Sequence, residues 1–424
     1  MHKNLTNVIY VTEKLLRSTM AKRNIFLFVL FLLVLGGCGC GPGAEKTGMP
    51  YLPLERRPAG ALVWDNVKRA GVPMVYRAVY DKALRLEPAD SLERMRNIVT
   101  GLGEAGYAAV DSQNQMDMVN SETVLRFCET VKAGETGTVT ILVPDYSGSL
   151  IQYDLKTAKG SVEVVRRYAQ YENGVMKNRS TAVYPADVWQ YTEEGYLLFG
   201  GSYYMADSYV LVMDDEPDHA ALRVAPLAEE CRELNRRYIL PAGYRQTNLF
   251  LTDWSEENFN NIDFYDIFDA LYVCARGHAN PYVMEHNPNA GIVYSVPEEE
   301  FESVVMPYFK IEQDTLRLET IYVEQEKAYE YRPRGFYEAG YSDTPYPEVV
   351  AYEKRADGTI ELTVNAVYPY EDTAKAFTHK VVVRPLKDGN FQYVSNRITT
   401  PEEAYDTWWY AKRLTMEEWE EIYQ

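Results

Sequence analysis

The chain has 424 residues, of which 46% are hydrophobic and 25% are charged, so it is long enough for two domains and apolar enough for a packed core. Residues 1–37 contain five basic and one acidic residue, so the formal charge of −19 for the whole chain becomes −23 from Cys38 onward. Binding to nucleic acid or flat adsorption to anionic lipid requires a basic surface, and this composition argues against both.

The N-terminal segment has the layout of a secretory signal. Lys22 and Arg23 precede the apolar run Ile25–Leu35, and a Gly-Gly-Cys sequence ending at Cys38 follows the run directly. A helix that spans a bilayer needs about 20 apolar residues, which is more than this run provides. We therefore predict a signal peptide over residues 1–37, with Met20 a better translation start than the first residue.

Leu35-Gly-Gly-Cys38 resembles a bacterial lipobox, which implies cleavage before Cys38 and a lipid on its sulfur. Cys40 lacks the apolar residue at the same offset, so Cys38 is the predicted lipid attachment site. We expect a lipoprotein on the outer face of the cytoplasmic membrane, held by two acyl chains. The alternatives are a plain signal peptide cut near Gly37 or Gly39, and a retained signal anchor.

Residues 38–60 contain much Gly and Pro without periodicity, and we predict a flexible tether there. The N-terminal module, 61–215, is predicted to begin with helices over 90–102 and 121–133, where apolar residues recur at helical spacing. The period then changes to two. The predicted strands cover 138–143, 150–154, 162–171, 180–188, 196–199 and 204–213, with a hairpin turn at Asn173-Gly174.

The charged stretch Asp214–Asp218 is the predicted domain boundary, and the C-terminal module covers 220–424. Helices are expected over 227–238, 262–275 and 297–309, and a last helix after Thr400 that carries Trp408 and Trp409. Strand-like sequence starts near Leu316, and two hairpins join 348–354 to 359–367 and 378–384 to 391–397. The predicted fold class is α+β, with two modules in which helices pack on a hairpin-rich antiparallel sheet.

Beyond Cys38 and Cys40 the chain contains three cysteines: Cys128, Cys231 and Cys274. Each lies in a stretch with helical spacing, so we expect all three to be buried. Their wide spacing does not fit a disulfide framework. One pair remains open as a disulfide, and the sequence does not choose it.

Several segments of the chain resemble one known family. They are Asn261–Asp266, Pro281-Tyr282, Ile292–Glu302, Tyr308–Ile311 with Leu316, and the strand Gly195–Phe199. Together they are similar to a family of uncharacterised membrane lipoproteins from clostridia and related Gram-positive bacteria, catalogued as a domain of unknown function. The resemblance covers most of residues 60–400. It implies an extracytoplasmic location and supplies no catalytic residue.

The sequence holds no GxSxG, Walker, HExxH or CxxC motif. His278, Glu285 and His286, near Cys274, form the one local group with metal-binding atoms, but their spacing does not by itself provide the three or four ligands that zinc needs. The acidic residues of 214–218 lack the EF-hand pattern and are interpreted as a solvated linker. We predict no metal and no cofactor.

Two further patterns are candidates for a binding or catalytic site. Asp263, Asp266 and Asp269 recur every three residues, which we interpret as acids in the first turns of a helix with neighbouring aromatics packed inward. Trp408 and Trp409, beside Tyr405 and Tyr410, are candidates for stacking on a sugar. Since neighbours on a helix point about 100° apart, we expect one of the two tryptophans to lie in the core.

These observations favour a non-enzymatic, membrane-anchored binding or interaction protein whose partner is a small molecule, a glycan or a protein. The alternative from another class is a cell-envelope hydrolase of the glycosidase type, which would use a pair of carboxylates. A third interpretation is an auxiliary subunit of a surface complex. A deep cleft that brings two acids together, one in apolar surroundings, would favour the hydrolase.

Overall fold

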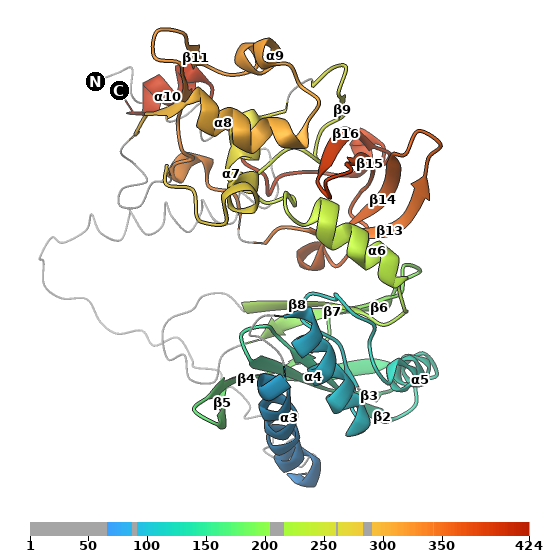
Figure 1. Cartoon of the computed structure of the whole chain (residues 1–424). Helices are drawn as coiled ribbons and strands as arrows, with labels where there is room; N and C mark the ends of the chain where they lie inside the picture. Colours follow the sequence, from blue (N-terminus) through green and yellow to red (C-terminus); the bar gives the residue numbers. More distant parts are fainter. Residues whose placement is uncertain are drawn as a thin grey trace, which may run out of the picture. The chain divides into compact units, whose positions relative to one another are not determined.

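The computed structural model describes residues 66–86, 91–203, 216–259, 262–282, 291–341 and 343–423, all of which belong to one unit, Asp65–Gln424. Helices and antiparallel sheets occur together in both halves of this unit, so the predicted α+β class is confirmed (Figure 1). The predicted signal peptide, Cys38 and the tether lie outside the described residues. None of the described helices is both long enough and apolar enough to cross a membrane.

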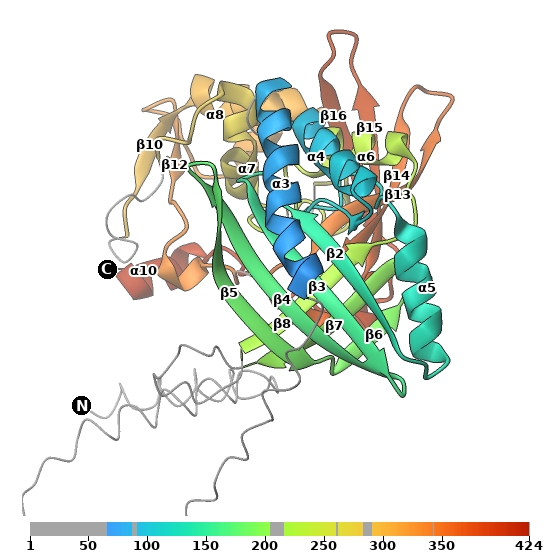
Figure 2. The same ribbon diagram turned by 90° about the horizontal axis from the view of Figure 1, so that it is seen from below.

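The N-terminal half begins with helices and continues as a meander. Helices α3 (Asn66–Leu86), α4 (Leu92–Glu104) and α5 (Ser121–Lys132) accompany the sheet β1-β2-β3-β4-β5. Its strands are β1 (Ala108–Ala109), β2 (Gly137–Pro144), β3 (Ser149–Ala158), β4 (Ser161–Glu172) and β5 (Val175–Pro185). Helices α3 and α4 lie side by side over this sheet, and α5 lies beside β2 (Figure 2).

The turns of this meander follow from local chemistry. Asn173 and Gly174, between β4 and β5, have φ angles of 51° and 78°. Two successive positive φ angles characterise the type I′ turn that matches the twist of a hairpin, and Asn-Gly is its preferred sequence. The hairpin predicted at this dipeptide is confirmed.

Two helices differ from the sequence prediction. Helix α3 was not expected, because Gly71 and Pro73 interrupt its pattern, yet Val72, Tyr76 and Ala83 all bury their side chains. Asn120 is the residue before α5, which lies where a helix was predicted, but it has a left-handed φ of 52° and its side chain does not cap the helix. Its Nδ2 instead donates to the carbonyl oxygens of Gly103 and Tyr107.

A three-stranded sheet, β6-β7-β8, follows: β6 (Val188–Tyr191), β7 (Tyr196–Tyr203) and β8 (Glu216–Arg223). Alternate side chains of β7 enter two different cores. Leu197 and Phe199 join the core under the meander, whereas Tyr196 and Leu198 pack against Val367 of the C-terminal half. Because the first part of β7 is covered on both faces, Tyr196–Phe199 form a continuous apolar run. The predicted strand 204–213 lies outside the described residues, and Glu216–Asp218 of the predicted boundary belong to β8.

The C-terminal half starts with α6 (Glu229–Leu234), which continues as a π-helical turn, Asn235–Ile239. Helices α7 (Phe264–Arg276), α8 (Glu298–Val305) and α9 (Gln313–Leu318) follow, with a small sheet β10-β12-β11. Its strands are β10 (Tyr294–Pro297), β11 (Tyr322–Val323) and β12 (Ala328–Tyr331). Single 3₁₀ turns cover Met306–Tyr308 and Phe336–Glu338.

The second large sheet has the order β13-β14-β15-β16-β9. Its strands are β13 (Tyr346–Lys354), β14 (Ile360–Val367), β15 (Thr378–Pro385), β16 (Phe391–Ile398) and β9 (Trp254–Ser255). Both hairpins expected here are confirmed. The helix expected after Thr400 is wrong: a 3₁₀ turn covers Glu402–Ala404, the two tryptophans lie in irregular chain, and the last helix is α10 (Met416–Tyr423).

Candidate functional site

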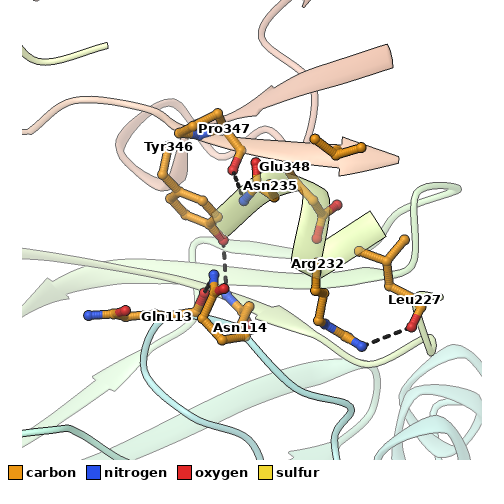
Figure 3. Close-up of a pocket in the computed structure, with 10 residues that line it drawn as sticks. Gln113, Asn114, Leu227, Arg232, Asn235, Tyr346, Pro347 and Glu348 are labelled. Atoms are coloured by element: carbon orange, nitrogen blue, oxygen red, sulfur yellow. Dashed lines mark hydrogen bonds between the residues drawn. The ribbon is translucent and has the colours of Figure 1, made fainter. Parts of the chain in front are cut away.

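Asn114 joins the two halves of the unit. It lies in the loop after β1, and Asp111 shapes this loop by accepting the backbone N–H groups of Gln113 and Met116 at 3.1 Å. The Nδ2 of Asn114 donates to Tyr346 Oη at 2.9 Å (Figure 3). Its Oδ1 accepts the backbone N–H of Arg223. One amide thus links the loop, β8 and β13.

A buried ion pair lies beside Asn114. Arg223 Nη1 and Glu348 Oε2 are 2.5 Å apart, and both side chains are less than a tenth exposed. Tyr196 Oη donates to the other carboxylate oxygen at 2.8 Å. Burial raises the pKa of Glu348, and the charge of Arg223 opposes that rise. The carboxylate is fully engaged, so Glu348 holds β13 against β7 and β8.

A small cavity lies between the two halves, lined by Gln113, Asn114, Gln115, Leu227, Arg232, Asn235, Tyr346, Pro347, Glu348 and Val349 (Figure 3). Its volume of about 10 Å³ has room for one water molecule. Gln115 Oε1, Arg232 Nε and Asn235 Oδ1 are buried there without a hydrogen-bond partner among the described residues. A single water molecule can donate to the two oxygen acceptors and accept from the arginine N–H. The cavity is too small for an organic ligand.

An open hollow of about 380 Å³ adjoins this cavity, and Arg232 lines both. The other lining residues come from α4, the loop before α5 and the start of α6: Arg96, Val99, Thr100, Met116, Asp117, Val119 and Glu229. Its charged groups are paired, since Arg232 lies 2.7 Å from Asp117, and Glu229 lies 3.4 Å from Arg96 and 2.9 Å from Arg236. The hollow can hold a small molecule but presents no nucleophile next to a base.

The three aspartates, Asp263 at the N-cap of α7 and Asp266 and Asp269 within it, form a largely buried charge network. The expected acids at the start of this helix are therefore paired with arginines and not simply held by the helix dipole. Asp266 is fully buried and accepts hydrogen bonds from Arg334, Arg413 and Tyr410. Asp263 begins the helix by accepting the backbone N–H groups of residues 265 and 266, and it also pairs with Arg413 at 3.2 Å. The sequence spacing identified the acids but not their arginine partners, which lie 68 and 147 residues away from Asp266.

Burial perturbs the outer two carboxyls of this network. Desolvation raises the pKa of Asp263, and it raises the pKa of Asp269 to about 6 although Arg413 acts in the opposite direction. Asp269 also accepts Tyr331 Oη at 2.5 Å and Asn280 Nδ2 at 2.8 Å. Raised carboxyl pKa values occur at catalytic sites, but here the oxygens are occupied by internal donors. The network binds the segment of Tyr410 and Arg413 to α7.

The candidate metal residues are not brought together in the described part of the chain. His278 is exposed and its Nδ1 lies 3.0 Å from the Ala279 carbonyl oxygen, while Glu285 and His286 lie outside the described residues. Searching those described ranges for three or more His, Cys, Asp or Glu side chains able to hold a metal finds none. Asp218, from the predicted acidic linker, accepts a hydrogen bond from Tyr184 and pairs with Arg166.

The three cysteines are unpaired in the structure. Cys128 and Cys231 are buried as expected, but Cys274 is exposed, because it lies on the outer face of α7 next to the exposed Val273. Burial raises the pKa of the Cys128 thiol to about 11, so this thiol is unreactive at neutral pH.

The tryptophan pair separates into one core and one surface residue. Trp409 is fully buried against Tyr368 and Phe377, whereas Trp408 is half-buried. Trp408 contacts Tyr341 and Tyr370, with ring centroids 4.8 and 5.9 Å apart. The expectation of one core tryptophan is confirmed, although the backbone there is not a helix.

The model of a family of unknown function, DUF6070, matches residues 68–413. The chain therefore belongs to this family, which confirms the expectation of an uncharacterised family. No curated protein and no solved structure matches the chain.

Proposed function

We propose that this member of the DUF6070 family is an extracytoplasmic lipoprotein, anchored through Cys38 on the outer face of the cytoplasmic membrane, and that it binds a ligand or partner without catalysing a reaction. The observation that carries the anchoring is the order of Lys22-Arg23, the apolar run Ile25–Leu35 and Gly36-Gly37-Cys38. That order is typical of a signal that ends in a lipid-modified cysteine. The acidic composition fits a protein held by lipid rather than by basic side chains.

Metabolic labelling tests the anchor. The full chain is produced in a Gram-positive host with radioactive palmitate, beside Cys38→Ala and the matched control Cys40→Ala. We expect label and membrane association in the wild type and in the Cys40 variant, and loss of both in the Cys38 variant. Label that survives Cys38→Ala would overturn the anchoring proposal.

The binding role is supported by the state of the buried carboxylates. Glu348, Asp263 and Asp266 are each paired with an arginine. A hydrolase needs one carboxyl free to donate a proton and a second free to attack or to activate water. Pairing of this kind suits a scaffold that holds loops in place around a binding surface.

A hydrolase remains the second candidate because Asp269 has a pKa of about 6, near that of a general acid. The full chain is incubated with cell-wall polysaccharide fragments, beside Asp269→Asn. Turnover that the substitution abolishes would favour the hydrolase over the binding protein. We expect no turnover from either protein.

Thermal shift of the full chain in a maltoside detergent tests binding itself, with glycans, wall fragments, peptides and small organic ions as probes. A ligand at a hundred times its dissociation constant stabilises the folded state by about 2.7 kcal/mol. We expect at least one class to raise the melting temperature. A flat response to all of them would contradict small-ligand binding and favour an auxiliary subunit with a protein partner.

A further inference from the structure

Basic side chains in this protein repeatedly lie over an aromatic ring while they pair with a carboxylate. Arg317 lies over the Tyr322 ring at 4.0 Å and pairs with Glu298 at 2.8 Å. The same three-part arrangement occurs at Arg223 with Tyr196 and Glu348, at Arg334 with Tyr410 and Asp266, at Arg413 with Tyr265 and Asp263, and at Lys354 with Tyr352 and Glu230. A ring face and a carboxylate attract the same cation, so the cation–π interaction and the ion pair reinforce each other.

One surface has the rings and the carboxylates, but none of the described arginines and lysines lies over those rings. We name it the Trp408 patch: the rings of Tyr341, Tyr370 and Trp408 with the carboxylates of Glu371 and Asp406. The Tyr341 ring stands at 72° to Trp408, and the Tyr370 ring at 59°. Rings inclined in this way form a corner rather than a flat stack.

The carboxylates of the patch are available. Glu371 and Asp406 are exposed, and neither forms an ion pair with any residue in the described ranges. Within the same ranges no arginine or lysine lies over the three rings. Burial raises the pKa of the adjacent Tyr368, and the charges of Glu371, Asp343 and Asp406 raise it further.

His219 is the basic group in contact with the patch. Its ring centroid lies 5.3 Å from that of Tyr370, and its Nδ1 lies 3.1 Å from Asp372. His219 is therefore paired with Asp372. It does not neutralise Glu371 or Asp406.

Hydrogen bonds and a buried aromatic residue hold the rings of the patch in position. Trp408 Nε1 donates to Glu371 at 2.8 Å, and the backbone N–H of Tyr341 donates to the Trp409 carbonyl oxygen at 3.2 Å. The buried Tyr368 stacks on Tyr370 and contacts Trp409 at 5.2 Å. A preorganised site loses less entropy when a ligand binds.

We infer that the Trp408 patch binds a small organic cation of the quaternary or substituted ammonium type. The aromatic corner receives the alkyl groups of such a cation, and the exposed carboxylates match its charge. This inference names a ligand class for the binding role proposed above and rests on it. The net charge of −19 favours a cationic ligand over an anionic one.

The experiment compares choline with its neutral isostere, 3,3-dimethylbutan-1-ol, on the full chain in a maltoside detergent, which carries no ammonium group. Saturation-transfer NMR on the methyl protons detects weak binding. We expect choline to bind at least about tenfold more tightly than the alcohol, since only the cation gains from the ring faces and the carboxylates.

Five variants locate the site. We expect Trp408→Ala to weaken choline binding by about tenfold or more and Glu371→Gln by about threefold. Tyr337→Ala, at an exposed tyrosine outside the patch, and Glu135→Gln, at an exposed acid of the N-terminal half, are matched controls that should bind as the wild type does. Trp408→Phe, which keeps a ring, should weaken binding less than Trp408→Ala.

Equal binding of choline and the alcohol would overturn the inference, as would choline binding that Trp408→Ala and Glu371→Gln leave unchanged. No choline binding together with a thermal-shift response to a glycan or peptide would overturn this inference alone. No response to any probe would overturn the binding role as well. Circular dichroism confirms that each variant is folded before its affinity is interpreted.

Discussion

The Asp266 network and the Trp408 patch use the same side-chain types with opposite outcomes. Around Asp266, two arginines, two tyrosines and three carboxylates are largely buried and hydrogen-bonded to one another. In the Trp408 patch, aromatic rings and carboxylates meet at the surface, and the described residues supply no arginine or lysine. The first region stabilises the fold. The second has ring faces and carboxylates without an arginine or lysine partner among the described residues, so they are open to a ligand.

The largest effect is expected from Asp266→Ala. The substitution leaves Arg334 and Arg413 buried without their central partner, and breaking a buried pair in this way costs about 3–5 kcal/mol. Urea unfolding followed by circular dichroism measures the loss, with Glu135→Ala at an exposed position as the control. A loss below about 1 kcal/mol would show that the network does not stabilise the fold.

Asn114 gives the next largest effect. Asn114→Gly keeps the left-handed backbone (φ 53°) and removes the side-chain bonds to Tyr346, Arg223 and Ala221, so we expect a loss of about 1–3 kcal/mol in the free energy of unfolding. Asn114→Ala adds backbone strain and should cost more. If both variants unfold at the same urea concentration as the wild type, Asn114 does not join the halves.

The pKa of Asp269 predicts a pH dependence confined to the network. Its folded-state pKa of about 6 lies above the ordinary value of 3.8, so the folded protein binds more protons than the unfolded chain between these two pH values. The contribution of Asp269 to stability therefore falls as the pH rises from about 4 to 6. Urea unfolding at several pH values should show that the free energy of unfolding of Asp269→Asn rises relative to that of the wild type across this window. A difference between the two that stays constant would contradict the assignment.

The smallest effect is expected from Glu371→Gln. Glu371 is exposed and has no ion pair within the described residues, so the free energy of unfolding should change by about 0.5 kcal/mol or less. Urea unfolding measures the change beside Asp266→Ala. A loss above about 2 kcal/mol would mean that the Trp408 patch is a structural cluster like the network.

Local elements followed well from the sequence. The hairpins at Asn173-Gly174 and Asp357-Gly358 were predicted because a turn needs only a few neighbouring residues with the right backbone freedom. Helix α3 was missed because Pro73 lies inside it, and its tertiary contacts outweigh that local cost. The exposure of Cys274 was predicted wrongly, since its helical stripe does not fix which face of α7 meets the core.

The sequence by itself determined the α+β class and the two hairpin-rich sheets, because each depends on neighbouring residues or on apolar periodicity. Lipid attachment at Cys38 stays a prediction from the sequence. Only the tertiary structure decided which charged and aromatic side chains are already satisfied. Asp266 meets Arg413 across 147 residues of chain, whereas Glu371 meets no such partner in the described residues. Such pairings are long-range and electrostatic, so no local pattern of acids or tryptophans reveals which of them remain open to a ligand.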